Sequence, residues 1–494
     1  MIGKRLLASV ASAALILSAP GPAIAAPAKT ATFRQAAPIT AKERQQGTAA
    51  HPDILQEYGG AQSGPQAAYA TRVGQRIAVQ SGLAASPQAF TVTLLNSPVE
   101  NAFAIPGGYV YLTRDLMALM NDEAELAAVL GHEVGHVAAR HSKKRQNAAT
   151  RNTILGAIGQ VLVGAVAGDS AIGGLLNKGI GTGTQLITLG YSRGQETQAD
   201  DLAVQYLVRA GYDPGALATM LRSLAAQETL DQRISGNSRS LPQWASTHPD
   251  PAARVQHATA QAAATRATGV RNRDAFLAAL DGLMYGDDPK LGVVEGRNFL
   301  HPGLRFAFTI PQGFTMQNGA NAVSISGPNA QAQFGTGAYQ GSLESYIGSV
   351  LQGLAGNGGA LPRSDIRRTS VNGIPAAYTQ IRANSGSTQV DVTVFAYAPS
   401  SGQAFHFVML TPAGQGIGAM ESMVESFRTL SASEAAAVKP RFVRVVTVKA
   451  GDTPASLSRR MAFTDYPLER FLVLNGLGSG SRLTPGQKVK LVTY

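Results

Sequence analysis

Apolar residues recur at helical spacing through residues 116–141, and this pattern predicts the central helices of the N-terminal half. The apolar positions are Leu116, Leu119, Met120, Leu126, Leu130, Val134 and Val137. Asn121 and Asp122 interrupt the pattern. We therefore expect two helices, the second capped near Asp122 with Glu125 three residues further on.

Strand-like alternation appears in two places. Before the central helices, Thr91–Leu95 and Tyr109–Leu112 predict a short β element. Beyond residue 290 the strand-like runs are Phe306–Ile310, Ala322–Ser326, Ala376–Arg382, Val390–Tyr397 and Ala404–Leu410. Helical stretches at 342–354 and 416–428 interrupt these runs, which indicates an α+β domain with an antiparallel sheet.

These patterns predict an α+β multidomain protein. We expect a signal peptide at 1–25, a flexible linker at 26–45, a mainly helical domain at 46–288, an α+β domain of unknown role at 289–435 and a small, separate domain at 440–494. A length of 494 residues is consistent with several domains.

The N-terminus predicts export. Lys4 and Arg5 precede an apolar run from Leu6 to about Ala19, and Ala23–Ala25 offers a small-residue cleavage site. A short membrane anchor is the alternative, but the run is shorter than the roughly 20 residues of a spanning helix. The chain has no cysteine, which excludes a lipoprotein anchor and restricts any metal site to His and carboxylate ligands. The expected location is the periplasm, with wall or membrane association.

Residues 152–190 are apolar and interrupted by glycines. They are either buried core helices or a segment beside the active site that touches a membrane surface or outer-membrane assembly proteins.

The net charge of +11 is concentrated in the tail, where residues 439–494 hold ten Lys or Arg against three Asp or Glu, a net of +7. This excess favours an anionic envelope partner or is simply a soluble surface. An exported chain is a poor candidate for binding nucleic acid.

The chemistry centres on His132-Glu133-Val134-Gly135-His136. Two His four residues apart lie on one face of a helix, where both imidazoles reach one zinc ion. Glu133, beside the first ligand, is placed to act as the general base. A third ligand is required, and Glu196 on a later helical pattern is the best candidate, with Asp200 one turn on as a hydrogen-bond partner of a ligand His. Alternatively, Glu196 and Asp200 form a solvated helix face. We expect His141 to lie on the surface.

Three motifs in this order resemble peptidase family M48, which includes the BepA-like periplasmic proteases. They are the His-Glu-x-x-His motif, the segment 192–200 that contains Glu196 and Asp200, and the segment 246–255 that contains His248 and Arg254. The resemblance implies a gluzincin site with one zinc on His132, His136 and Glu196, and Glu133 as the base.

Other roles at this site follow less directly. The resemblance places His248 and Arg254 near the site. His248 is then a fourth ligand in a resting state, a donor to the developing oxyanion, or a structural loop residue, and Arg254 can pair with a carboxylate. Asn101–Leu112 is a candidate substrate-pairing strand or an ordinary core hairpin.

The tail resembles a LysM module over residues 445–492. The order strand, two short helices, strand is accompanied by Gly451-Asp452-Thr453, Leu474-Asn475 and Pro485-Gly486-Gln487. The resemblance implies binding to the N-acetylglucosamine-containing glycans of peptidoglycan. Pro454 departs from the usual polar residue, and a protein-docking role is the alternative.

The leading hypothesis is therefore a zinc-dependent metalloendopeptidase that cleaves protein or peptide substrates, such as misfolded or stalled envelope proteins, and is tethered to peptidoglycan. The alternatives are a hydrolase of peptidoglycan peptides and a chaperone or scaffold of outer-membrane assembly.

Overall fold

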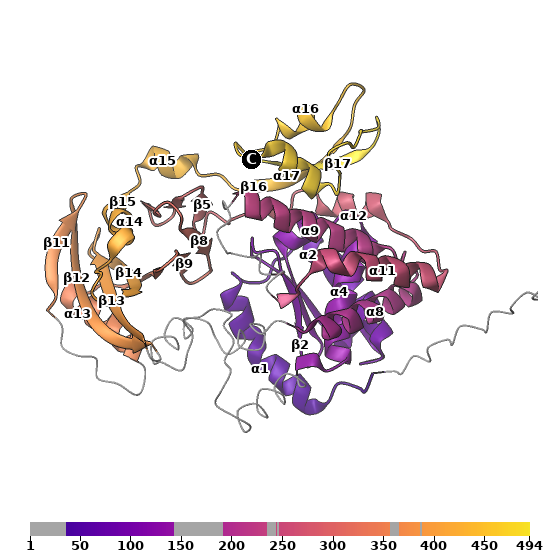
Figure 1. Cartoon of the computed structure of the whole chain (residues 1–494), viewed down its shortest axis with the longest axis horizontal. Helices are drawn as coiled ribbons and strands as arrows, with labels where there is room; N and C mark the ends of the chain where they lie inside the picture. Colours follow the sequence, from indigo (N-terminus) through magenta and orange to yellow (C-terminus); the bar gives the residue numbers. More distant parts are fainter. Residues whose placement is uncertain (1–35, 143–190, 235–243, 245–246, 356–364, 386–387) are drawn as a thin grey trace, which may run out of the picture. The chain divides into compact units, whose positions relative to one another are not determined.

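A computed structural model describes residues 36–142, 191–234, 244, 247–355, 365–385 and 388–494 (Figure 1). The predicted signal peptide and the apolar stretch 152–190 lie outside the described residues. Within them, no helix has both the length and the apolar character needed to cross a membrane. The α+β multidomain fold class is confirmed.

Helix α4 is the centre of the N-terminal part, buried from Glu123 to His136 and packed against α2, α8 and α9. The helices here are α1 (Ala41–Glu57), α2 (Pro65–Ala78), α3 (Arg114–Leu119), α4 (Glu123–Ala138), α8 (Arg193–Ala210), α9 (Ala216–Ile234), α11 (Pro251–Thr265) and α12 (Arg273–Leu280). The predicted break between α3 and α4 is confirmed, since Asp122 Oδ1 accepts from the Glu125 amide at 2.9 Å. Capping of this kind satisfies an amide that has no partner within the helix.

A three-stranded sheet in the order β1-β3-β2 precedes α4. Its strands are β1 (Thr91–Leu95), β2 (Ala102–Ile105) and β3 (Tyr109–Thr113). β1 pairs parallel with β3, whereas β2 pairs antiparallel with β3. The turn between β2 and β3 contains Gly107 and Gly108, which both have positive φ. β2 is consequently an edge strand of this sheet.

The lead-in predicted as flexible over 26–45 is wrong for its last part, because α1 begins at Ala41. Thr40 and Glu43 form a reciprocal capping box there. Gly47 lies directly against the Pro106 carbonyl and the Tyr109 ring, which leaves no room for a side chain. Helix α1 therefore packs on the β2–β3 hairpin.

Residues 293–429 form two further sheets, of seven strands (β11-β12-β13-β14-β10-β9-β8) and four strands (β15-β7-β6-β5). Their strands are β5 (Val293–Glu295), β6 (Asn298–His301), β7 (Phe306–Thr309), β8 (Thr315–Asn318), β9 (Val323–Ser326), β10 (Gln331–Ala338), β11 (Arg367–Val371), β12 (Ile374–Ser385), β13 (Thr388–Tyr397), β14 (Gln403–Pro412) and β15 (Arg428–Thr429). One face of the larger sheet shares a phenylalanine-rich core with the smaller sheet, and α13 (Leu343–Ala355) covers another core with its apolar face.

The helix predicted over 416–428 is shorter than expected. It consists of a 3-10 turn at Gly418–Met420 and α14 (Glu421–Glu425). Ser426 follows, and its hydroxyl accepts from the Thr309 amide at 2.8 Å. This contact directs the chain away from the helix and into β15. After it, α15 (Ala432–Ala437) precedes the tail module.

The tail has the predicted strand–helix–helix–strand order, with β16 (Arg441–Thr447), α16 (Pro454–Ser458), α17 (Pro467–Leu474) and β17 (Lys488–Thr493). Pro454 occupies the first turn of α16 behind the N-cap Thr453, a position where its missing amide hydrogen costs nothing. The expectation of a separate unit is wrong, because β16 also pairs with β4 (Met284–Tyr285), which follows α12.

Candidate metal centre

Helix α4 presents His132 and His136 on one face, and their Nε2 atoms lie 3.0 Å apart. Helix α8 supplies Glu196 in its first turn. Ser192 caps the start of this helix, because its side chain accepts a hydrogen bond from the Gln195 amide. The two helices approach closely at Gly135, where a Cβ atom would lie 3.2 Å from the Ala199 carbonyl oxygen. The glycine inside the motif thus allows Glu196 to reach the two histidines.

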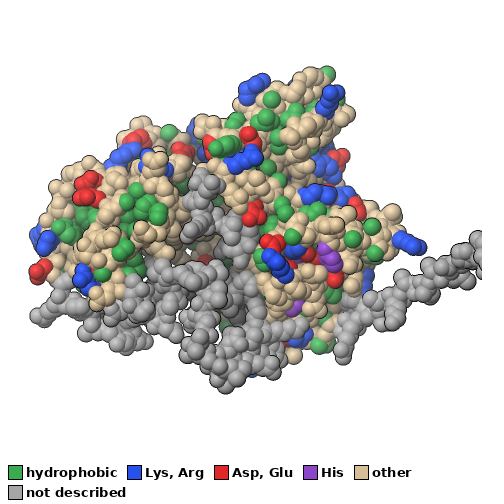
Figure 2. Space-filling view, in the orientation of Figure 1, with side chains coloured by type: hydrophobic (Ala, Val, Ile, Leu, Met, Phe, Trp, Pro, Cys, Tyr) green, Lys and Arg blue, Asp and Glu red, His purple; other side chains and the backbone are tan. Residues whose placement is uncertain are grey.

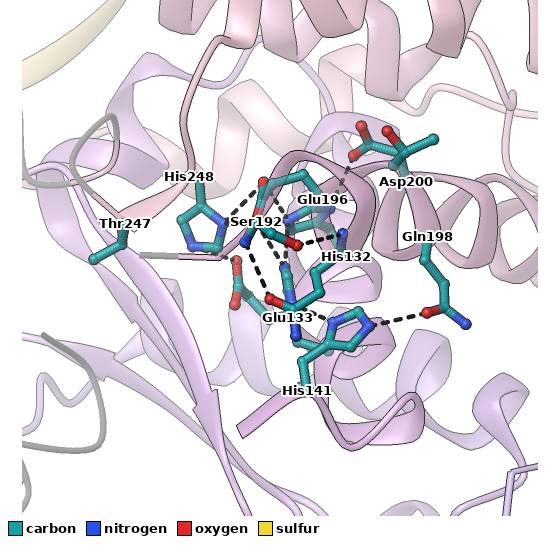
Figure 3. A network of polar contacts seen from close by, with 12 residues as sticks. His132, Glu133, His141, Ser192, Glu196, Gln198, Asp200, Thr247 and His248 are labelled. Atoms are coloured by element: carbon teal, nitrogen blue, oxygen red, sulfur yellow. Dashed lines mark hydrogen bonds and ion pairs between the residues drawn. The ribbon is translucent and has the colours of Figure 1, made fainter. Parts of the chain in front are cut away.

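His248 completes a cluster of four buried side chains with His132, His136 and Glu196. Figure 3 shows His248 beside Glu196 and Glu133. His248 Nδ1 lies 3.3 Å from His132 Nε2 and 3.1 Å from Glu196 Oε1. Glu196 oxygens lie 3.3 Å from His136 Nε2 and 3.5 Å from His132 Nε2. The ligand atoms of tetrahedral zinc, bound at 2.0–2.1 Å, are about 3.3 Å apart. The residues present therefore fit a single zinc ion.

The charged side chains of Asp200 and Arg254 surround the cluster and hold its members in place. Asp200 Oδ1 lies 2.9 Å from His132 Nδ1, which leaves Nε2 of that ring free to bind a metal. Arg254 on α11 donates to both Asp200 oxygens at 2.8 and 2.6 Å, and its Nη1 lies 2.5 Å from Glu196 Oε2. Arg254 thus faces the two carboxylates.

Opposing effects set the pKa values of these groups. Burial acts to raise the pKa of Glu196, but His248, His132 and His136 hold it well below its ordinary value. Burial acts to lower the pKa of His132, but hydrogen bonds to Asp200 and Glu196 raise it to about 9. The centre is therefore anionic at Glu196, and protons compete with a metal for His132.

His141 is buried, so the prediction that it lies on the surface is wrong. The helix ends at Ala138, and Arg140 adopts a left-handed conformation with φ of 52° that turns the chain back. His141 Nδ1 then lies 2.8 Å from His136 Nδ1, and His141 Nε2 lies 3.1 Å from Gln198 Oε1. Because Gln198 Oε1 can only accept, a neutral His141 carries its proton on Nε2 and donates it to Gln198. His141 Nδ1 then accepts the Nδ1 proton of His136, which leaves His136 Nε2 unprotonated.

Two aromatic rings that the sequence reasoning missed cover the cluster. Tyr191 stacks on His136 with ring centroids 3.6 Å apart, and Trp244 stacks on His248 at 4.0 Å. The His248 amide also donates to the Trp244 carbonyl oxygen at 2.7 Å. Trp244 thereby contributes to the orientation of His248, although spacing along the chain gives no sign of it.

Glu133 is fully buried beside the cluster, and neither carboxylate oxygen has a hydrogen-bond partner among the described residues. Burial raises the pKa of Glu133, while the nearby His248 and His132 act to lower it. A buried carboxylate with a raised pKa is suited to accept a proton.

Comparison with known proteins identifies the two modules. Residues 65–262 match the model of peptidase family M48, and residues 446–492 match the LysM domain model. The chain contains a peptidase family M48 domain. Peptidases of this family use zinc, in agreement with the ligand set.

The M48 domain is similar to several curated proteins. It is 31% identical over 193 residues to the beta-barrel assembly-enhancing protease of Yersinia pestis, covering 38% of this chain and 37% of that protein. It is 30% identical over 217 residues to the mitochondrial metalloendopeptidase OMA1 of Schizosaccharomyces pombe, covering 43% and 59%. Metalloprotease LoiP of Escherichia coli is 34% identical over 158 residues, covering 32% and 56%. The similarity thus spans less than two thirds of each relative.

We predict that His141→Ala weakens zinc binding by about 10- to 100-fold, because His136 loses the partner that orients its ring. The measurement is competition for zinc with a chromophoric chelator. His257→Ala is the matched control, since His257 pairs with Asp201, is 36% exposed and is not a member of the cluster. Equal zinc affinities for the two variants would contradict the assigned role of His141.

Proposed function

We propose that the chain is a zinc-dependent endopeptidase of the bacterial cell envelope. The observation that carries the proposal is the convergence of His132, His136 and Glu196 around one point, with the buried Glu133 beside it. The M48 match and the names of the relatives, which are proteases or metalloendopeptidases, support it.

The roles of the site residues belong to this proposal. His132, His136 and Glu196 would hold one zinc per chain, which when bound polarises a substrate carbonyl and activates a water molecule. Glu133 accepts the proton of the attacking water and delivers it to the leaving amine. Asp200 orients His132, and Arg254 holds Asp200 and Glu196 in place.

The substrate strand belongs to the proposal as well. β2 is an edge strand whose neighbour β3 leads directly into α3 and α4. An edge strand offers main-chain groups to an extended peptide, which gives affinity with little dependence on sequence. Such a mode suits an enzyme that acts on misfolded or stalled envelope proteins.

Localisation and tethering rest on the two ends of the chain. The export pattern at 1–25 supports a periplasmic location, and the LysM module at 440–494 supports attachment to peptidoglycan glycans. Exposed basic residues of this module include Arg444, Lys449, Arg459 and Arg460, which suits an anionic envelope. In the view of Figure 2, Lys and Arg side chains are dispersed among acidic ones rather than gathered in one large patch.

His248 holds the site in a resting state. Its Nδ1 lies 3.3 Å from His132 Nε2 and would be a fourth ligand where a catalytic zinc ion needs an open position, and its Nε2 lies 3.5 Å from Glu133 Oε1. The ring is 1% exposed and stacked on Trp244. Activity then requires that His248 leave the cluster.

Glu133→Gln is expected to lower casein cleavage by about 10²- to 10⁴-fold, since the amide cannot accept a proton. Zinc content should remain at one per chain, because the amide keeps the shape and Glu133 is not a ligand. The measurement is casein cleavage beside metal analysis for the wild type and the variant. Absence of zinc from both proteins would overturn the proposal.

Cleavage by the wild type should fall as pH decreases from 8 to 5. The raised pKa of Glu133 means that its base form is lost at a higher pH than the ordinary 4.5 of a glutamate. Protonation of the histidine ligands acts in the same direction. A pH profile of kcat/KM checks this, and a profile that is flat between pH 5 and 8 would contradict it.

His248→Ala should raise the rate of casein cleavage by about threefold or more, because it frees the position that His248 occupies in a mostly resting population. Trp244→Ala should act in the same direction through loss of the stacking contact. His257→Ala is the control and should leave the rate unchanged. A loss of activity in His248→Ala would instead indicate that His248 takes part in the reaction.

A further inference from the structure

A buried lysine joins the LysM module to the M48 domain. Lys490 lies on β17 and is 0% exposed, between the apolar neighbours Val489 and Leu491. Its Nζ donates to the carbonyl oxygens of Ala118 at 2.7 Å, Leu119 at 3.3 Å and Met120 at 2.5 Å. These carbonyls end helix α3, where acceptors lack the amide donors of a following helical turn.

The module holds the backbone of Lys490 rigidly. Asn475, at the end of α17, accepts from the Lys490 amide at 2.7 Å and donates to the Lys490 carbonyl oxygen at 2.9 Å. Asn475 is itself buried. A fully buried lysine is rare in proteins, because its desolvation must be offset by well-placed partners. The contact is therefore a specific one, built from both modules.

Two more contacts reach the junction between α3 and α4, one from α12 and one from the loop after α17. Arg273 donates to the Asn121 carbonyl oxygen at 2.9 Å and to the Lys488 carbonyl oxygen at 3.2 Å. A Cβ atom on Gly476 would lie 3.0 Å from Asn121 Nδ2, so the loop after α17 abuts the same residue. Pairing of β16 with β4 extends the interface.

This junction is the start of the helix that carries the metal ligands. The Asn121 amide donates to Glu125 Oε2 at 2.8 Å, and Asp122 caps α4. Arg271 binds Asp122 at 2.7 Å and Glu125 at 3.3 Å. From this cap to His132 the helix rises by about 14 Å, so a displacement of the junction is carried along α4 to the ligands.

We propose that Lys490 is a positioning residue for the metal centre, and that the LysM module thereby forms part of the active M48 domain instead of serving only as a tether. The effect on the reaction rests on the proposed peptidase function. The effect on α4 does not, and a separate measurement can report it.

The test is Lys490→Met, which keeps an unbranched side chain and removes all three donors. We expect hydrogen exchange of the amides from Asn121 to Leu130 to accelerate by about tenfold or more, with exchange in α2 unchanged. In casein cleavage, kcat should fall by about tenfold with KM nearly constant, since small misplacements of reacting groups are costly. A merely stabilising role would accelerate exchange throughout the protein and leave kcat of the folded fraction unchanged.

Lys488→Met is the matched control, since Lys488 lies on the same strand with its side chain 37% exposed and 3.6 Å from Asp274. Arg273→Met probes the same junction from the M48 side and serves if Lys490→Met does not fold. Selective exchange in α4, with no cleavage by either the wild type or His248→Ala, would support the positioning role and refute the peptidase proposal. Exchange and kcat of Lys490→Met and Arg273→Met that match Lys488→Met would overturn the inference.

Discussion

The close packing of α4 on α8 is the constraint on which the metal centre depends. Gly131 and Gly135 face Ala203 and Ala199 across this contact, and a Cβ atom at Gly135 would crowd the Ala199 backbone. A larger side chain would push α8 outward and withdraw Glu196 from the two histidines. The candidate ligands thus come together because small residues on the facing surfaces of α4 and α8 allow the two helices to approach closely.

The metal centre also depends on compensation of its buried negative charges. Glu196 and Asp200 are almost fully buried, and desolvation alone would favour their protonated forms. Arg254 pairs with both carboxylates, and the imidazoles supply further hydrogen bonds. Buried charges are tolerated when they are paired in this way, and Glu196 stays ionised to meet a cation. Among the described residues, Glu133 on α4 has neither a hydrogen bond nor an arginine partner, which distinguishes its environment from that of Glu196 on α8.

The two ends of α4 are held by different parts of the chain. Just before its start, Lys490 of the LysM module donates to the Ala118 and Met120 carbonyl oxygens, and Arg273 of α12 donates to the Asn121 carbonyl oxygen. At its end, the left-handed Arg140 returns His141 to the ring of His136. Helix α4 is therefore fixed at both ends by contacts outside the motif. Its neighbours Tyr191 and Trp244 close the cluster from the sides.

The sequence by itself determined the features that depend on local geometry. The pitch of a helix places His132 and His136 together, and the Asp122 cap and the strand–helix–helix–strand order of the tail follow from short-range patterns. Glu196 was a candidate ligand from its helical pattern, but spacing alone also allowed a solvated face, and the resemblance to a family favoured the ligand role. His248 became a candidate through that resemblance. Tertiary structure decided the rest. A single left-handed residue reversed the prediction for His141, and the burial of Lys490 depends on carbonyls some 370 residues away. Such contacts between distant segments leave no periodic trace in the chain, since they arise from how the modules pack and not from how each one folds.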